Sequence, residues 1–257
     1  MQPIDPKQRF GDRVADYVRF RPSYPPALLD WLRREHGLAP DWRIADIGAG
    51  TGISSKMFLD AGHAVVAVEP NSEMRAAAAR WLGASAGFST VDGSAEATGL
   101  AAASVDLVSA AQAFHWFDPP AVKREWTRIL RPGGLIAVYW NIRRIAGTPF
   151  LAGYENVLRE NGMDYVSDAE RYAGSERMLA WFGAGFRGHA CFANAQRLDL
   201  DALVGRTLSS SYAPRAGQPK HEALLGALRS LFDATQSDGR VSIDYDTRIF
   251  VGVPTPA

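Results

Sequence analysis

A hydrophobic segment that runs directly into three closely spaced glycines constrains this chain more than any other feature. Residues 42–47 form the apolar segment, and Gly48, Gly50 and Gly52 follow at every second position. The next residues, 53–61, carry apolar side chains on one helical face. A strand, a glycine turn and a helix in this order are typical of the first unit of a nucleotide-binding α/β sheet. Glycines at the turn let a ligand approach the backbone where any Cβ would collide.

Two details of this segment bear on the kind of ligand. The dinucleotide fingerprint requires a glycine three residues after Gly50, and that residue is Ile53. Asp46, two residues before Gly48, would repel a pyrophosphate but suits a ligand with an ammonium group and hydroxyls. An NAD-dependent oxidoreductase therefore stays an alternative that Ile53 argues against. A non-catalytic protein that binds a cofactor on the same fold is another alternative.

Charge and composition exclude several classes of protein. The chain has 257 residues with 28 Lys+Arg and 28 Asp+Glu, so its balanced charge favours neither nucleic acid nor a membrane surface as partner. The single cysteine, Cys191, excludes an internal disulfide, and its place in an apparent strand predicts a buried thiol. No apolar stretch of about 18 residues and no signal peptide is found, which predicts a cytoplasmic protein. The scattered histidines have no metal-ligand spacing, so no metal site is expected.

Further strands follow the glycine turn at regular intervals. The run 64–68 is apolar throughout, as in a parallel strand buried on both faces. It ends at Glu69, whose carboxylate can accept hydrogen bonds from both hydroxyls of a ribose. Residues 87–91 and 104–110 predict the third and fourth strands. A helix that starts at Asp118-Pro119 and a turn at Arg131-Pro132-Gly133-Gly134 lead to the fifth strand, 135–140.

Before this core, residues 8–36 read as two helices joined by the proline-rich link 21–26. They either pack on the edge of the sheet or cover a ligand with Tyr17 and Arg21 facing it. After the core, a helix starts at Thr148-Pro149, residues 188–197 predict a sixth strand, and residues 240–251 predict a seventh. The intervening helices, 199–208 and 219–232, would place Ser209, Ser211 and Tyr212 over the site.

Two motifs carry a resemblance to a known family. D-x-G-x-G-x-G, from Asp46 to Gly52, resembles motif I of the class I S-adenosylmethionine-dependent methyltransferases. A-Q-A-F-H-W-F-D, a helix, L-R-P-G-G and a strand resemble the methyltransferase type 11 group over residues 42–141. The segment from Phe10 to Pro25 resembles, with small differences in spacing, the N-terminal cap of a bacterial and fungal group of these enzymes.

The resemblance implies a Rossmann-like α/β fold, doubly wound, with seven strands in the order 3-2-1-4-5-7-6 and the last strand antiparallel. One methyltransferase domain, 1–257, would comprise a helical cap (1–40), a cofactor-binding core (42–141) and a lid region with strands six and seven (142–257). The implied cofactor is S-adenosyl-L-methionine. The expected cofactor-binding residues are Asp46, Gly48, Ala49, Gly50, Gly52, Glu69, Asn71, Met74, Ser94, Ala95, Gln112, Tyr17 and Arg21.

The implied reaction makes modest demands on side chains. Displacement at a sulfonium mainly requires alignment of the two reactants and exclusion of water. An alcohol, an acidic carbon or a protonated amine also requires a base, whereas a carboxylate acceptor does not. His115, which follows the fourth strand, is the candidate base, and Trp116 is a candidate wall of the transfer pocket. Trp140 is a second candidate wall of this pocket. For all three residues, a plain packing role is the alternative. The expected partner is a small-molecule methyl acceptor, and the protein is expected to be a monomer or homodimer.

Overall fold

The computed structural model describes residues 20–167 and 175–253, and its strands form one sheet. The strand order is β3-β2-β1-β4-β5-β7-β6, which confirms the predicted topology. Strand β7 is antiparallel to both of its neighbours, and the other strand pairs are parallel. The strands are β1 Arg43–Ile47, β2 Ala64–Val68, β3 Phe88–Val91, β4 Val105–Ala111, β5 Leu130–Arg143, β6 Phe186–Leu198 and β7 Val241–Gly252.

Helices connect these strands close to where the sequence predicts them. The described helices are α2 Pro26–His36, α3 Ile53–Asp60, α4 Ser72–Leu82, α5 Pro119–Ile129, α6 Pro149–Asn161, α8 Ser175–Phe182, α9 Leu200–Leu208 and α10 His221–Thr235. Two short 3₁₀ helices, η3 Phe114–Trp116 and η4 Gly183–Gly185, complete the set of described elements. Most of the predicted helix at residues 8–21 lies outside the described residues. No described helix is long and apolar enough to cross a membrane.

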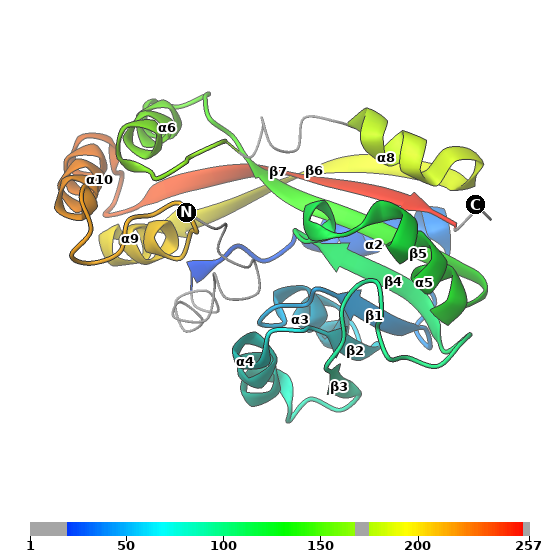
Figure 1. Ribbon diagram of the computed structural model, residues 1–257. Helices are drawn as coiled ribbons and strands as arrows, with labels where there is room; N and C mark the ends of the chain where they lie inside the picture. Colours follow the sequence, from blue (N-terminus) through cyan, green and yellow to red (C-terminus); the bar gives the residue numbers. More distant parts are fainter. Residues whose placement is uncertain (1–19, 168–174, 254–257) are drawn as a thin grey trace.

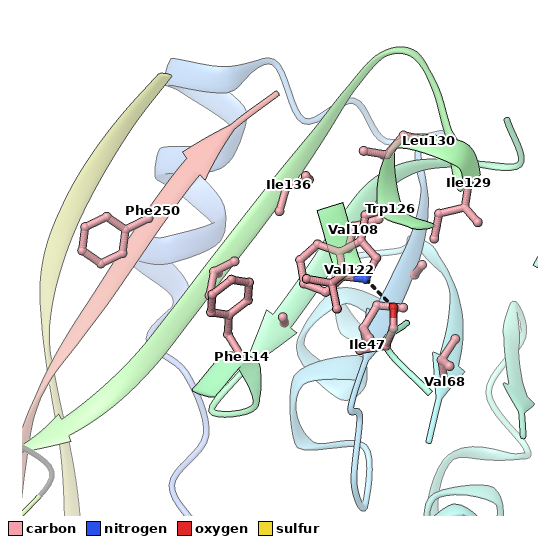
Figure 2. Close-up of a cluster of buried hydrophobic side chains, with 14 of the residues drawn as sticks. Ile47, Val68, Val108, Phe114, Val122, Trp126, Ile129, Leu130, Ile136 and Phe250 are labelled. Carbon is pink, nitrogen blue, oxygen red and sulfur yellow. Dashed lines mark hydrogen bonds between the residues drawn. The ribbon is translucent and has the colours of Figure 1, made fainter. Parts of the chain in front are cut away.

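Alternation along the buried strands sends side chains to two apolar layers. In β1, Ile44 points to the layer formed by α2 and α3, and Ala45 and Ile47 point to the layer formed by α5 and α8. Figure 2 shows part of the second layer, with Trp126 of α5 beside the strands. Trp140 also lies in this layer, so the structure makes it a core aromatic rather than a pocket wall. Helices on both faces leave ligands only the edges of the sheet.

The last three strands are longer than the rest, and one expectation about them is wrong. Strands β6 and β7 have 13 and 12 residues, against five in β1, and β5 continues past the predicted end at Trp140 because Arg143 still pairs with Tyr245. Cys191 is exposed, not buried, because alternate residues of the edge strand β6 point to solvent.

The projecting ends of β6 and β7 carry a third apolar cluster with α6, α9 and α10, which we call the helical lobe. In Figure 1 these three helices gather around one end of the β6–β7 pair, away from β1, β2 and β3. The lobe is continuous with the sheet because its strands are continuations of the core strands. It therefore stands beside the carboxyl edge of β1 and β4, where open α/β sheets bind ligands.

Candidate functional site: the glycine loop and its pocket

The turn between β1 and α3 is built from glycines for both conformational and steric reasons. Gly48, Gly50 and Gly52 all have positive φ angles, +65°, +57° and +91°. A Cβ at position 48 would lie 2.9 Å from Ala113 Cβ, and one at position 52 would lie 2.6 Å from Leu82 Cδ1. The loop is thus packed tightly from below by the β4 loop and by α4. The opposite side of the loop lines a pocket.

This pocket lies at the carboxyl edge of the sheet and holds about 500 Å³ of empty space, part of it open to solvent. It brings together five of the predicted cofactor-binding residues, Arg21, Gly48, Ala49, Gly50 and Gln112. Its other lining residues are Pro22, Tyr24, Thr51, Ile53, Ser54, Ala111 and Asn141. No Asp, Glu or His is found among the described residues that line it.

Glu69, at the end of β2, ties the glycine loop to the start of α4. Its Oε2 accepts a hydrogen bond from Gly50 N and its Oε1 accepts one from Asn71 N, both at 2.9 Å. Burial raises the pKa of Glu69, and the two N–H groups oppose that shift. A carboxylate has about four lone-pair sites, so each oxygen keeps capacity for a further donor such as a ribose hydroxyl. The geometry is compatible with the predicted role, which stays a prediction.

Asn71 and Met74 occupy the helix start beside this carboxylate. Asn71 Oδ1 accepts hydrogen bonds from Glu73 N and Met74 N at 3.0 Å, which makes Asn71 the N-cap of α4. Met74 is buried, and its Sδ would lie 3.8 Å from a Cβ at position 50. Both predicted residues therefore lie at the loop. Their described contacts are with the protein itself.

Asp46 lies beneath the glycine loop rather than on the described pocket wall. Its side chain is fully buried on the α3 face of β1, where Oδ2 accepts a hydrogen bond from Ser55 Oγ at 2.7 Å. Burial raises the pKa of Asp46 to about 6, against the opposing effect of the serine hydroxyls. Next to it, Tyr139 OH lies 2.5 Å from Ser54 Oγ and 2.9 Å from Ser109 Oγ.

Sequence reasoning missed this buried hydroxyl cluster. The available signals are the pair Ser54-Ser55 directly after the glycines and a tyrosine, Tyr139, in an otherwise apolar run. Burial of Tyr139 raises the pKa of its phenol far above the usual value, so the hydroxyl stays neutral. The cluster holds the β1–α3 turn in place by hydrogen bonds to β4 and β5.

Gln112, just after β4, lies on the pocket wall in a constrained conformation. Its φ angle is +56°, and its backbone N donates to Tyr139 O. Its side chain is paired with the backbone of Asn141: Oε1 accepts from Asn141 N at 2.9 Å and Nε2 donates to Asn141 O at 3.3 Å. The side-chain amide therefore extends the β4–β5 ladder by one step. Asn141, which the sequence analysis did not single out, thereby becomes part of the pocket wall.

The predicted catalytic residues are placed elsewhere. His115 and Trp116 lie in η3 with both side chains exposed and with their ring centroids 4.7 Å apart. Neither lines the pocket that the structure describes. A base role for His115 and a pocket role for Trp116 stay predictions.

Ser94 and Ala95 lie in the loop after β3, where an adenine is expected. Ser94 Oγ accepts a hydrogen bond from Ala97 N at 3.2 Å, which stabilises the turn. Ala95 is buried, and its carbonyl accepts a hydrogen bond from Trp126 Nε1 at 3.0 Å. The hydrogen bond from Trp126 anchors the loop to α5. Their role toward adenine stays a prediction.

The expected convergence of cap and lid residues is found only in part. Arg21 lines the pocket and its Nη2 donates to Ser209 O, at the end of α9, at 3.0 Å. Tyr212 packs edge-to-face on Tyr165, with centroids 4.8 Å apart, and does not line the pocket. Tyr17 lies outside the described residues. Within the described ranges no cluster of His, Cys, Asp or Glu could hold a metal ion.

Comparison with known proteins identifies the core. The methyltransferase domain family known as type 11 matches residues 45–138, which run from β1 to β5. This part of the chain is similar to class I methyltransferase domains. An uncharacterized methyltransferase from Mycobacterium tuberculosis is 42% identical over 138 residues, which is 52% of each chain. This chain thus matches about half the length of that relative.

Solved structures resemble the methyltransferase domain together with the helical lobe. A candidate type II methyltransferase from Anaeromyxobacter dehalogenans has a TM-score of 0.68 at 25% identity over 93% of this chain and all of that one. A methyltransferase from Geobacter sulfurreducens, in complex with S-adenosyl-L-homocysteine, has a TM-score of 0.52 at 17% identity over 99% of this chain and all of that one. The second likeness concerns the fold alone.

Proposed function

We propose that this protein transfers the methyl group of S-adenosylmethionine to a small-molecule acceptor. The main support for the proposal is the hydrogen bond from Gly50 N to Glu69. It fixes a strand-end carboxylate at the glycine loop, in the part of the chain that matches a methyltransferase domain. A carboxylate there suits the ribose, and the glycine backbone suits the methionine end of the cofactor. The Geobacter sulfurreducens protein, which has this fold, binds S-adenosyl-L-homocysteine.

Other predicted residues complete the proposed binding mode. Arg21, at the pocket, would pair with the methionine carboxylate, and Ser94 and Ala95 would contact the adenine. An NAD-dependent oxidoreductase is the weaker alternative, because Ile53 replaces the third glycine of the dinucleotide fingerprint and lines the pocket itself.

The bound cofactor would supply a methyl group on a sulfonium, which is already a good leaving group. The residues of the chain then bind, orient and exclude water. Gln112 and Asn141 fix one wall by their mutual hydrogen bonds, and Arg21 joins that wall to α9 through Ser209. Because no Asp, Glu or His is found among the described pocket-lining residues, we propose transfer by proximity to an acceptor that needs no base.

The cofactor assignment is tested by titration calorimetry. The wild-type protein should bind S-adenosylmethionine and S-adenosylhomocysteine and not NAD. Glu69→Ala should weaken cofactor binding by about one to two decades, because a charge-assisted hydrogen bond contributes roughly 1.5–3 kcal/mol. Glu222→Ala, which removes an exposed carboxylate from α10, is the matched control and should bind like the wild type. Equal cofactor affinity in a folded Glu69→Ala protein would contradict the assignment.

The same preparation decides the role of His115. If transfer occurs by proximity, His115→Ala should keep both cofactor affinity and methyl transfer, measured as S-adenosylhomocysteine released from an acceptor panel. A loss of about two to four decades in turnover, with an acidic limb missing from the pH profile, would assign a base role instead.

A further inference from the structure

Arg206, on α9, is a buried cation whose described partners are all neutral. Its side chain is 4% exposed; Nε donates to Tyr245 OH at 3.3 Å and Nη1 donates to Ser210 Oγ at 3.1 Å. Among the residues that the structure describes, Arg206 forms no ion pair, and its Nη2 donates to none of them. Arginine is rarely buried unless it is paired, because an uncompensated charge in the interior is costly.

Acidic side chains on two packed elements, α6 and β7, are engaged elsewhere. Glu155, on α6, is paired with the buried Arg143 and also with Arg159 at 2.8 Å. Along β7, Asp244 and Asp246 alternate with Tyr245, so they point to the opposite face of the strand. Asp246 there pairs with Arg144 at 2.7 Å. Among the described residues, none of these carboxylates is paired with Arg206.

Two chains of contacts join Arg206 to the pocket at the glycine loop. One runs along α9, since Arg206 O accepts from Ser209 Oγ and Ser209 O accepts from Arg21, which lines the pocket. The other runs from Tyr245 OH to Gln196 Oε1 at 2.8 Å and from Gln196 Nε2 to Phe20 O at 3.0 Å. The second chain ends one residue before Arg21. Arg206 thus belongs to the surroundings of the proposed methyl-transfer pocket, on the side of the helical lobe.

Hydroxyl groups of neutral side chains surround this guanidinium. The pKa of Tyr154, whose OH lies 2.8 Å from Thr207 Oγ1, is raised by burial to about 12, so that phenol is no anion at neutral pH. The pKa of Tyr245 is likewise raised, chiefly by burial. Neutral tyrosines can donate to an anion and cannot neutralise an arginine.

We propose that Arg206 binds the carboxylate of the methyl acceptor, so that the acceptor is a small organic carboxylic acid. This inference rests on the proposed methyl transfer and narrows its substrate class. Since no described residue forms an ion pair with Arg206, the single charge of a monocarboxylate would balance it, whereas a phosphate dianion would bring a second negative charge. A planar guanidinium and a carboxylate also match in geometry.

The experiment uses the full chain saturated with S-adenosylhomocysteine, which leaves the acceptor region free. Probes are acetate, butyrate, octanoate, benzoate and phenylacetate, each compared with its primary amide, and inorganic phosphate. Thermal unfolding and calorimetry should show that at least one carboxylate binds while its amide does not. In Arg206→Met, the affinity for that carboxylate should fall by about 10- to 100-fold, with S-adenosylhomocysteine affinity unchanged. Arg206→Lys, which keeps the charge without the planar fork, should lie between the two.

Arg206→Met should fold, because it removes a buried charge without leaving a charged partner behind. Its melting temperature without ligands should equal or exceed that of the wild type. Arg144→Met, which removes an exposed arginine directly after β5, is the matched control and should respond like the wild type. If the wild type does not bind S-adenosylhomocysteine, the proposed function fails. If it binds but no carboxylate of the panel does, or only phosphate does, or Arg206→Met responds like the wild type, the carboxylate inference alone is overturned.

Discussion

At the scale of single residues, Asp46 shows how one carboxylate can belong to a motif and yet be withdrawn from the pocket. Its side chain is fully buried and held by Ser55 of the following helix. A carboxyl group in such surroundings favours the proton, which is why its pKa rises to about 6 from an ordinary 3.8. The stability of the fold beneath the glycine loop should therefore depend on pH through Asp46.

The raised pKa of Asp46 predicts a particular pH dependence of stability. The folded state holds the proton more tightly than the unfolded chain, so the stabilisation is complete below about pH 4 and is lost as the pH rises to about 6. Asp46→Asn mimics the protonated side chain and should lack this loss. Relative to Asp46→Asn, the wild type should lose on the order of 2–3 kcal/mol between these pH values. Urea unfolding of both proteins at several pH values measures it, and a constant difference would disprove the raised pKa.

At the scale of elements, the glycine loop combines a left-handed backbone with close packing. Gly48 needs both, because its φ is +65° and a Cβ there would meet Ala113 and Phe117. Gly133 lies inside β5, in the segment 131–134 where the sequence predicts a turn, and it needs only the first, because its φ is +83° and no heavy atom lies within 4 Å of an added Cβ. The two positions separate conformational strain from steric collision.

Alanine substitutions at these two positions should differ accordingly. Gly133→Ala should cost about 1–2 kcal/mol of unfolding free energy, which is the strain of a left-handed alanine. Gly48→Ala should cost about 2–5 kcal/mol, because overpacking adds roughly 1–3 kcal/mol to the same strain. Gly48→Ala should also weaken S-adenosylhomocysteine binding, while Gly133→Ala should not. Urea unfolding and calorimetry measure both, and equal costs at the two positions would show that the loop yields to the added methyl group.

At the scale of the whole molecule, an ion pair joins the helical lobe to the sheet. Arg143, near the end of β5, is 3% exposed, pairs with Glu155 of α6, donates to Tyr165 OH at 2.6 Å and lies over the ring of Tyr154. The same carboxylate also accepts a hydrogen bond from Tyr165 OH. The lobe thus packs on the sheet through a charge pair that is almost fully buried.

Removal of one partner should therefore be far more damaging than removal of both. Glu155→Gln leaves the buried Arg143 without its anion and should cost about 3–5 kcal/mol of unfolding free energy. The double change Arg143→Met with Glu155→Leu replaces the pair by apolar side chains and should recover most of that loss. Urea unfolding of the single and double variants provides the measurement. A double variant no more stable than Glu155→Gln would show that the pair contributes more than charge compensation.

Much of the core could be predicted from the sequence because its signals are local. The apolar run of β2, the glycines of the loop and the proline start of α5 act within a few residues, and the structure has these elements where they are expected. The resemblance to a family supplied the order of the strands, including the antiparallel β7, and the sheet topology confirms it.

The tertiary structure alone decided which side chains meet. Arg21 and Ser209 are 188 positions apart in the chain, and Asn141 and Thr247 are 106 apart, so no local pattern relates them. Burial is a property of the assembled layers: it withdraws Asp46 from the pocket, leaves His115 exposed, and encloses Arg206 among neutral hydroxyls. The sequence by itself determined the strand–loop–helix units and the chemistry available to them, because backbone preference and periodicity are local. The charge balance of the lobe was decided only by folding, because it depends on which distant residues share one interior.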